Sequence, residues 1–184
     1  QQATPLTKPL LNQLLSNCDN SIRGLRNKVL LRLGYETMRR RSELCAFRFE
    51  DGSLTPNGKP VMRLNFSKTD QFGAGKLIPI SEELLELIDK WKILVDGEGY
   101  ILRSINRHGY IGNSLNPASI STILKALQAG LEDGAKVKSL SGHSFRVGAA
   151  LDLLEQGEPL ERIMLKGGWQ SDSTAMKYLR HWII

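Results

Sequence analysis

The sequence predicts an α+β fold that is mainly helical and includes one small antiparallel β-sheet. Three observations support this prediction. Apolar residues recur at helical spacing over the first part of the chain. Between residues 60 and 80 the pattern changes to short alternating runs bounded by turn-forming residues. Helical patterning then returns and continues toward the C-terminal end. The sequence shows no internal repeat and no low-complexity tract.

Two amphipathic helices and a third, shorter helix are expected before residue 50. The first is predicted from four leucines that share one helical stripe: Leu10, Leu11, Leu14 and Leu15. The second is predicted from a similar stripe formed by Ile22, Leu25, Val29 and Leu33. A third helix should carry the segment RRRSELCAF, residues 39–47.

The predicted sheet follows two groups of turn residues, Asp51-Gly52 and Pro56-Asn57-Gly58. In the segment PVMRLNFS, Met62, Leu64 and Phe66 alternate with Val61, Arg63 and Asn65, as in a strand. A second extended run, KLIPI, comes after the Gly73-Ala74-Gly75 turn. The two runs together predict a small hairpin or sheet.

Helices make up the rest of the predicted fold. The segment SEELLELIDKWKILV should begin with Ser81 as its N-cap, with Glu82 and Glu83 beside the positive end of the helix dipole. Further helices are expected at 117–131, 142–156, 159–165 and 172–182.

The composition narrows the class of partner. Lys and Arg exceed Asp and Glu by 25 − 19 = 6 among 184 residues, and the sequence pI is near 9.4, so nucleic acid is the first partner to consider. The two cysteines, Cys18 and Cys45, lack CxxC spacing, which indicates reduced thiols and a cytoplasmic setting. The sequence has no apolar run suited to a membrane span, so no membrane partner is expected.

The stretch from His143 to Trp182 gathers residues suited to phosphate chemistry. If Ser141 caps a helix, the backbone N–H groups that follow form a site for an anion. His143 and Arg146 are three residues apart and share a helix face, which pairs a proton-transfer group with a guanidinium that grips phosphate oxygens. Lys166-Gly167-Gly168-Trp169 permits a tight turn that presents an indole N–H. Tyr178 follows, and a phenol can serve as a nucleophile.

Each of these residues also has a purely structural interpretation. A histidine near a helix start is commonly a cap or a core residue. Trp169 alone suits a hydrophobic core, and Tyr178 fits the apolar stripe of a last helix together with Met176, Leu179 and Trp182. The run Arg39-Arg40-Arg41 suits a solvated basic face. Only the joint order and spacing of these residues favours the functional interpretation.

The joint pattern consists of His143-Ser-Phe-Arg146, then Gly167-Gly168-Trp169, then Tyr178. It resembles the active-site segment of the tyrosine recombinases of the phage integrase family. ETMRRRSELCAF resembles the helix that carries the family's first arginine, three residues before an acidic residue, so Glu43 selects Arg40. FSKTDQFGAGKLIPIS resembles the family's lysine-bearing β-hairpin, with Lys68 rather than Lys76 as the counterpart of its lysine. Trp169 departs from the commonest pattern, because many members have a second histidine there, although one branch has tryptophan.

The resemblance implies a mechanism and a role for each matched residue. Tyr178 would attack a DNA phosphodiester, forming a 3′-phosphotyrosyl link and releasing a 5′-hydroxyl. Arg40, Arg146 and Trp169 would stabilise the negative charge of the transition state. Lys68 would protonate the leaving oxygen, His143 would assist proton transfer, and Glu43 would orient its neighbours. No cofactor is expected, neither a metal ion nor ATP.

The resemblance also bears on partners and domain organisation. Double-stranded DNA would be the substrate, with further backbone contacts from basic residues: Arg39, Arg41, Lys125, Lys136 and Lys138. Residues 1–9 resemble the end of a linker from an N-terminal core-binding domain that is absent here, and 10–184 would form the catalytic domain. The full-length protein, encoded by a bacterium or a phage, would assemble as a tetramer on DNA.

Two other interpretations share the same residues. A DNA-relaxing enzyme similar to the type IB topoisomerases would use the same tyrosine chemistry without a specific partner site. A non-catalytic DNA-binding module would bind DNA and form no covalent adduct. The sequence does not reveal the target site, nor whether the reaction integrates, excises or resolves DNA.

Overall fold

The computed structural model describes residues 4–65, 75–132, 138–169, 177, 179 and 180. Its helices are α1 (Lys8–Ser16), α2 (Ile22–Thr37), α3 (Arg41–Ala46), α4 (Glu82–Leu94), α5 (Ser119–Ala129), α6 (Gly142–Glu155) and α7 (Leu160–Gly167). A short 3-10 helix spans Phe49–Asp51. The strands are β1 (Gly52–Leu54), β2 (Pro60–Leu64) and β3 (Lys76–Pro79). This arrangement confirms the predicted fold class.

The sheet is antiparallel, with strand order β1-β2-β3. Gly52 pairs with Met62, and Leu64 pairs with Lys76. The sequence predicted β2 and β3 but not β1, because Asp51-Gly52 was interpreted only as a turn. The chain turns at 55–58, as Pro56-Asn57-Gly58 predicted, and the Gly58 amide donates to the Thr55 carbonyl at 2.8 Å.

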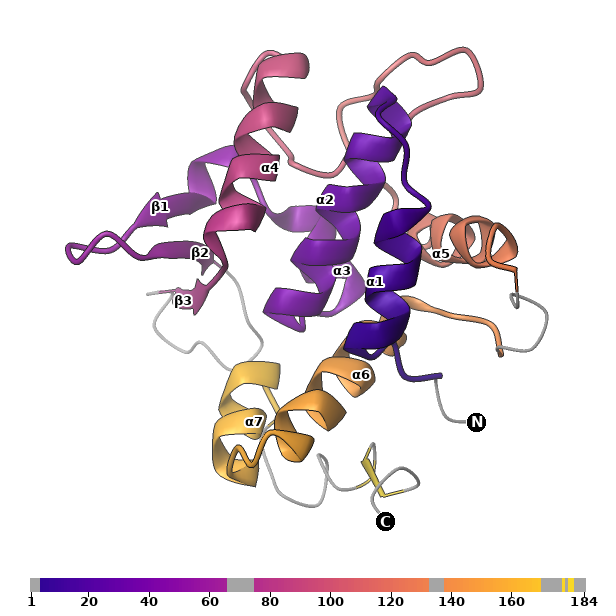
Figure 1. Ribbon diagram of the computed structural model, residues 1–184. Helices are drawn as coiled ribbons and strands as arrows, with labels where there is room; N and C mark the ends of the chain where they lie inside the picture. The colour runs from indigo at the N-terminus through magenta and orange to yellow at the C-terminus, as the bar shows by residue number, and fades with distance from the viewer. Residues whose placement is uncertain (1–3, 66–74, 133–137, 170–176, 178, 181–184) are drawn as a thin grey trace.

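Helix α2 runs through the centre of the molecule, with α1 and α4 beside it and α6 below (Figure 1). The prediction that α2 is amphipathic is wrong. Its buried residues include Val29, Leu30, Leu31 and Leu33 on successive faces, whereas Ile22 of the predicted stripe is 42 % exposed. A helix contacted from several sides buries most of its surface, so no single apolar stripe forms.

Two polar anchors join the helices to one another. Glu36 on α2 accepts hydrogen bonds from the Ser81 amide at 2.6 Å and from its hydroxyl at 2.9 Å. The same hydroxyl caps α4 by accepting from the Leu84 amide at 3.1 Å, as the sequence predicted. On α6, Asp152 accepts from the Tyr35 hydroxyl and from the Lys8 amide. These bonds fix α1, α2, α4 and α6 relative to one another.

The segment before α1 contributes a residue to the hydrophobic core. Leu6 is fully buried, and its amide donates to the Ser144 carbonyl at 2.9 Å. Helix α1 starts at Lys8 and contains all four leucines of the predicted stripe. Leu6 therefore packs against α6, while Lys8 and Pro9 are exposed.

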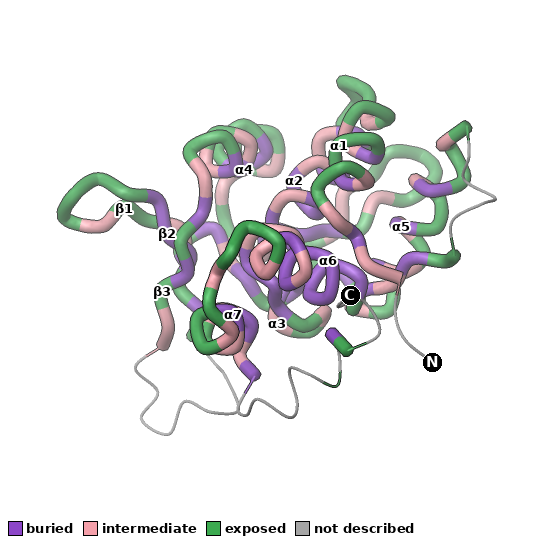
Figure 2. Tube along the Cα trace, turned by 60° about the horizontal axis from the view of Figure 1, so that its bottom comes forward, coloured by how far each residue is buried: buried purple, intermediate pink, exposed green. Residues whose placement is uncertain are grey.

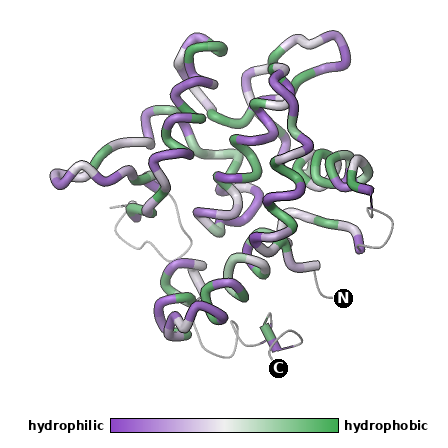
Figure 3. The backbone as a smooth tube through the Cα atoms, in the orientation of Figure 1, coloured by the Kyte–Doolittle hydropathy of each residue, from purple (hydrophilic) through white to green (hydrophobic). Residues whose placement is uncertain are grey.

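The hydrophobic core falls into two clusters. The larger one lies among α1, α2, α4, α5, α6 and the sheet. The smaller one contains Met38, Ala149, Ala150, Ile163, Trp169 and Leu179. Figure 2 shows many buried residues along α6. Figure 3 shows hydrophilic and hydrophobic residues alternating along α7, as expected for a helix with one buried face. The smaller cluster supports the site described next.

Candidate active site

A left-handed residue at the end of α2 directs the chain into the site. Met38 has φ 56°, a conformation that costs a non-glycine residue about 1 kcal/mol. Complete burial of its side chain in the smaller core cluster offsets this cost. The turn ends α2 and makes Arg40 the N-cap residue of α3, so two consecutive arginines lie between the helices.

These two arginines have different environments. Arg40 is exposed, and its amide donates to the Glu43 carboxylate at 3.0 Å. Arg39 is 2 % exposed; its Nε donates to the Thr37 carbonyl at 2.9 Å and a terminal nitrogen donates to the Lys166 carbonyl. Burial is the main cause that lowers the pKa of Arg39. We expected Arg39 at the surface as a phosphate contact, and the structure instead encloses it.

Helix α6 carries His143 in its first turn and Arg146 nearly one turn further along. Ser141 is the N-cap residue, as predicted, and its amide donates to the Ser144 hydroxyl at 2.9 Å. Gly142 packs against the Arg41 side chain so closely that a Cβ there would lie 2.1 Å from Arg41 Cγ. The first turns of α3 and α6 therefore lie side by side.

His143 lies within the field of three arginines. Partial burial is the largest cause that lowers the pKa of its imidazole, and the charges of Arg146, Arg41 and Arg40 lower the pKa further. Part of the imidazole is enclosed, but the residue as a whole remains open to solvent. A neutral imidazole beside several guanidinium groups suits a proton acceptor next to a bound anion.

Arg146 is 4 % exposed and contacts the Gly167-Gly168-Trp169 turn. A terminal nitrogen donates to the Gly167 carbonyl at 2.5 Å, and the guanidinium carbon lies 4.8 Å from the centroid of the Trp169 ring. Gly168 takes the left-handed conformation at φ 73°, which a glycine adopts without strain. The turn is closed by the Trp169 amide, which donates to the Met164 carbonyl at 3.0 Å.

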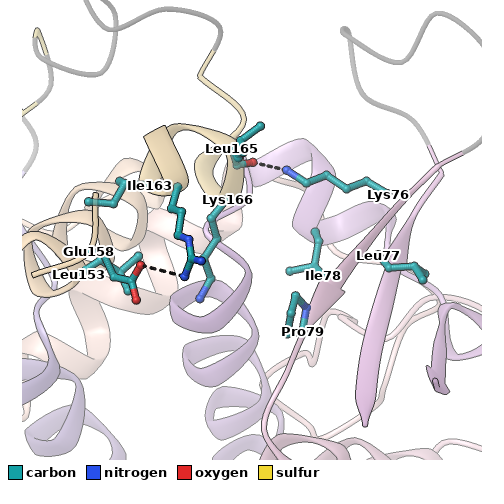
Figure 4. A pocket seen from close by; sticks show the side chains of 10 residues that line it. Lys76, Leu77, Ile78, Pro79, Leu153, Glu158, Ile163, Leu165 and Lys166 are labelled. Atoms are coloured by element: carbon teal, nitrogen blue, oxygen red, sulfur yellow. Dashed lines mark hydrogen bonds and ion pairs between the residues drawn. The ribbon is translucent and has the colours of Figure 1, made fainter. Parts of the chain in front are cut away.

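A lysine from the sheet reaches the same turn. Figure 4 shows Lys76 of β3 donating to the Leu165 carbonyl at the end of α7. Burial is the main cause that lowers the pKa of Lys76, and the Arg39 charge adds to it. Nothing in the sequence indicates this contact, because it depends on how β3 and α7 meet in space.

The structure thus brings together Arg40, His143, Arg146 and Trp169, with Glu43 at the start of α3. Lys68 and Tyr178 lie outside the described residues, as does Lys136. Leu179, next to Tyr178 in the sequence, is fully buried in the cluster that contains Trp169. Among the predicted DNA contacts, Lys125 and Lys138 are exposed and Arg41 is partly exposed.

Comparison with known proteins identifies the class of protein. Residues 5–182 match the phage integrase family. The chain is 29% identical over 196 residues to the Cre recombinase of Escherichia phage P1, with 98% of this chain and 57% of the relative covered. It is 30% identical over 171 residues to a XerD integrase/recombinase homologue of Selenomonas ruminantium, with 88% and 49% covered. The chain therefore belongs to the phage integrase family, and it spans about half the length of these two relatives.

Solved structures show the same fold. A post-cleavage complex of XerH recombinase with palindromic difH substrate superposes with a TM-score of 0.75 at 18% identity, covering 97% of this chain and 50% of that one. XerA recombinase superposes with a TM-score of 0.72 at 17% identity, covering 97% and 60%. No helix in the described ranges combines the length and the apolar character needed to cross a membrane.

Proposed function

We propose that the chain is the catalytic domain of a site-specific DNA recombinase that cleaves and rejoins DNA through a 3′-phosphotyrosyl intermediate. The observation that carries this proposal is the meeting of His143, Arg146 and Arg40 at the adjoining ends of α3 and α6. A single phosphate placed there would contact two guanidinium groups and a neutral imidazole. Family membership supports the same conclusion.

In the proposed reaction, the Tyr178 oxygen attacks the scissile phosphorus. A bond from phosphorus to the tyrosine oxygen forms while the bond from phosphorus to the 5′-oxygen breaks. His143 assists removal of the phenol proton, and Lys68 supplies a proton to the departing 5′-oxygen. One phosphodiester is exchanged for another, so rejoining needs no ATP.

Charge neutralisation is the second part of the proposed mechanism. Negative charge grows on the non-bridging oxygens as the tyrosine attacks, and Arg40 and Arg146 would hold these oxygens. Trp169 would donate a further hydrogen bond. Because Arg146 is already fixed by Gly167 and by stacking on Trp169, little reorganisation is needed when DNA binds. These groups neutralise the phosphate themselves, so we expect the reaction to proceed in a metal chelator.

The other tyrosines in the described residues are less suited to be the nucleophile. The Tyr35 hydroxyl donates to Asp152, and burial is the main cause that raises the pKa of Tyr35. The Tyr100 ring stacks against the Arg48 guanidinium at 4.8 Å. Tyr110 is 74% exposed on the loop before α5, and this loop is bonded through Asn106 to Arg23 at the start of α2. Tyr178, adjacent in sequence to the buried Leu179, remains the preferred candidate.

The proposed partner is double-stranded DNA, in a tetramer of the full-length protein that includes an N-terminal core-binding domain. Two relatives were solved as complexes with DNA, XerH with difH substrate and a lambda integrase dimer with a COC′ core site. The phage and bacterial origin of the curated relatives supports a phage or bacterial source and a cytoplasmic location.

The proposal is tested by incubating the full-length protein with nicked duplexes of random sequence in the presence of a metal chelator. The cleaved fragment dissociates from such a duplex, so the strand cannot be rejoined and the covalent adduct is trapped. Denaturing gels should show a covalent adduct in the wild type and in Tyr110→Phe but none in Tyr178→Phe. DNA binding without any adduct would instead identify a binding module. Adduct formation with relaxation of single supercoiled plasmids and no strand exchange would identify an enzyme of the type IB topoisomerase kind.

A further inference from the structure

The last three carbonyls of α7 all accept from cationic side chains. Leu165 accepts from Lys76 of β3, Lys166 from Arg39 between α2 and α3, and Gly167 from Arg146 of α6. The final carbonyls of a helix have no partner within the helix and carry its partial negative charge. Three separate parts of the chain therefore hold the end of α7, from which the Gly167-Gly168-Trp169 turn continues.

Arg39 joins this turn to the segment that carries Arg40. One donor of its guanidinium reaches Thr37 at the end of α2, and another reaches Lys166 at the end of α7. A Cβ added to Gly168 would lie 3.4 Å from an Arg39 terminal nitrogen, so the guanidinium lies directly against the turn. With 2% exposure, the charge depends on these protein contacts rather than on water.

Arginine suits this place better than other buried residues. Its planar fork presents several donors in fixed directions, so it bonds two carbonyls on different elements at once. A lysine reaches one of them as a point charge, and a methionine fills the space without any hydrogen bond. The contact is therefore specific to the guanidinium and does more than fill the core.

We propose that Arg39 is a positioning residue that holds the Gly167-Gly168-Trp169 turn against the Arg40 segment, so that Arg40, Arg146 and Trp169 are aligned on one phosphate before DNA arrives. This inference rests on the proposed strand-transfer function. It assigns Arg39 a role inside the protein and not at the DNA surface.

The test compares Arg39→Met and Arg39→Lys with Arg26→Met in the full-length protein. Arg26 is a matched control, because it is 3% exposed and donates to the Arg103 carbonyl at 2.9 Å, but it lies near the start of α2. Four quantities are measured: the melting temperature, the affinity for a nicked duplex, the rate of adduct formation at saturating DNA, and amide hydrogen exchange over residues 164–169.

Arg39→Met should slow adduct formation by about 10- to 100-fold, because misplacing catalytic groups by a fraction of an ångström to an ångström has effects of that order. Its DNA affinity should stay near that of the wild type, and exchange of the Trp169 amide should accelerate. Arg39→Lys should recover part of the rate. Arg26→Met should lower the melting temperature yet keep the rate and the exchange of 164–169.

The positioning role is overturned if folded Arg39→Met forms the adduct at the wild-type rate. It is also overturned if the rate of adduct formation falls in proportion to the melting temperature in the Arg39 and Arg26 variants alike. A loss confined to DNA affinity would also overturn it and restore Arg39 as a DNA contact. If Arg39→Met does not fold, Arg39→Lys decides by the same rate and exchange measurements. Absence of any adduct in the wild type would instead defeat the proposed function, which separates the two failures.

Discussion

Arg146 is bound on two sides, by the Gly167 carbonyl and by the Trp169 ring. A lysine in its place keeps the charge but loses the planar group that stacks on the indole and grips two oxygens. Arg146→Lys should therefore lower the rate of adduct formation by roughly 100- to 1000-fold, as for removal of one donor to a developing oxyanion. Rates are measured on saturating nicked DNA.

The matched control for Arg146 is Arg26→Lys, since Arg26 is a buried arginine bonded to a carbonyl away from the site. It should retain the wild-type rate at a temperature where both variants are folded. Equal rates in Arg146→Lys and wild type would contradict the assignment of Arg146 to the transition state.

His143 gives the proposed reaction a pH dependence. Because burial and then the charges of Arg146, Arg41 and Arg40 lower the pKa of His143, its neutral form persists below the ordinary histidine value of about 6.5. If the neutral imidazole accepts a proton, the rate should be nearly constant above pH ~6.5 and fall as the pH drops through the lowered pKa.

The variant His143→Gln should lack this acidic limb and react about 100-fold more slowly at neutral pH, the lower end of general-base effects. A pH–rate profile of single-turnover adduct formation checks both statements. An acidic limb that persists unchanged in His143→Gln would show that another group titrates.

At the scale of elements, α6 is placed by close contact with the chain before α1. A Cβ at Gly148 would lie 2.1 Å from the Leu6 carbonyl oxygen, and this backbone cannot move aside like a flexible side chain. Alanine is favoured over glycine by about 1 kcal/mol inside a helix. The clash should outweigh that gain, because overpacking typically costs 1–3 kcal/mol or more.

Gly148→Ala should therefore lower the melting temperature measured by circular dichroism and accelerate exchange of the Leu6 amide, which donates to Ser144. Gly130→Ala is the control, since a Cβ there would meet its nearest neighbour at 3.4 Å. It should leave the melting temperature almost unchanged. A Gly148→Ala protein as stable as wild type would contradict the described packing of Leu6 on α6.

Elements with strong local signals were predicted closely from the sequence. Helix α4 begins after the Ser81 cap and α6 after Ser141, as predicted, because capping is decided by residues adjacent in the chain. The sheet's first strand and the burial of α2 on several sides were not predicted. Both depend on which segments meet across the fold, and local periodicity carries no information about that.

The same distinction applies to the site. The sequence pointed to His143, Arg146 and Trp169, and the structure places them together. Apart from the spacing to Glu43, nothing in the sequence separates the inward Arg39 from the exposed Arg40. The burial of Arg39 depends on its contact with the end of α7, which lies far away in the sequence. The Lys76 contact with Leu165 was equally invisible.

At the scale of the whole molecule, the formal net charge of +6 predicts salt-sensitive DNA binding. Lys125 is exposed on α5. If it contacts a phosphate, Lys125→Ala should reduce the magnitude of the slope of log affinity against log salt by about one. Fluorescence anisotropy on a duplex at several salt concentrations measures this slope.

The control for Lys125 is Lys90→Ala, an exposed lysine on α4. It should leave the slope as in the wild type. Equal slopes for Lys125→Ala and wild type would show that Lys125 does not contact a DNA phosphate. That result would not change the assignment of the active-site residues.

Mapping the covalent link would show whether Tyr178 is the residue that becomes joined to DNA. The adduct formed on nicked DNA is digested with protease and nuclease, and the modified peptide is sequenced by mass spectrometry. We expect a nucleotide joined through its 3′-phosphate to Tyr178, with a free 5′-hydroxyl on the released strand. A link to Tyr35, Tyr100 or Tyr110, or a phosphate joined through the 5′ end, would contradict it.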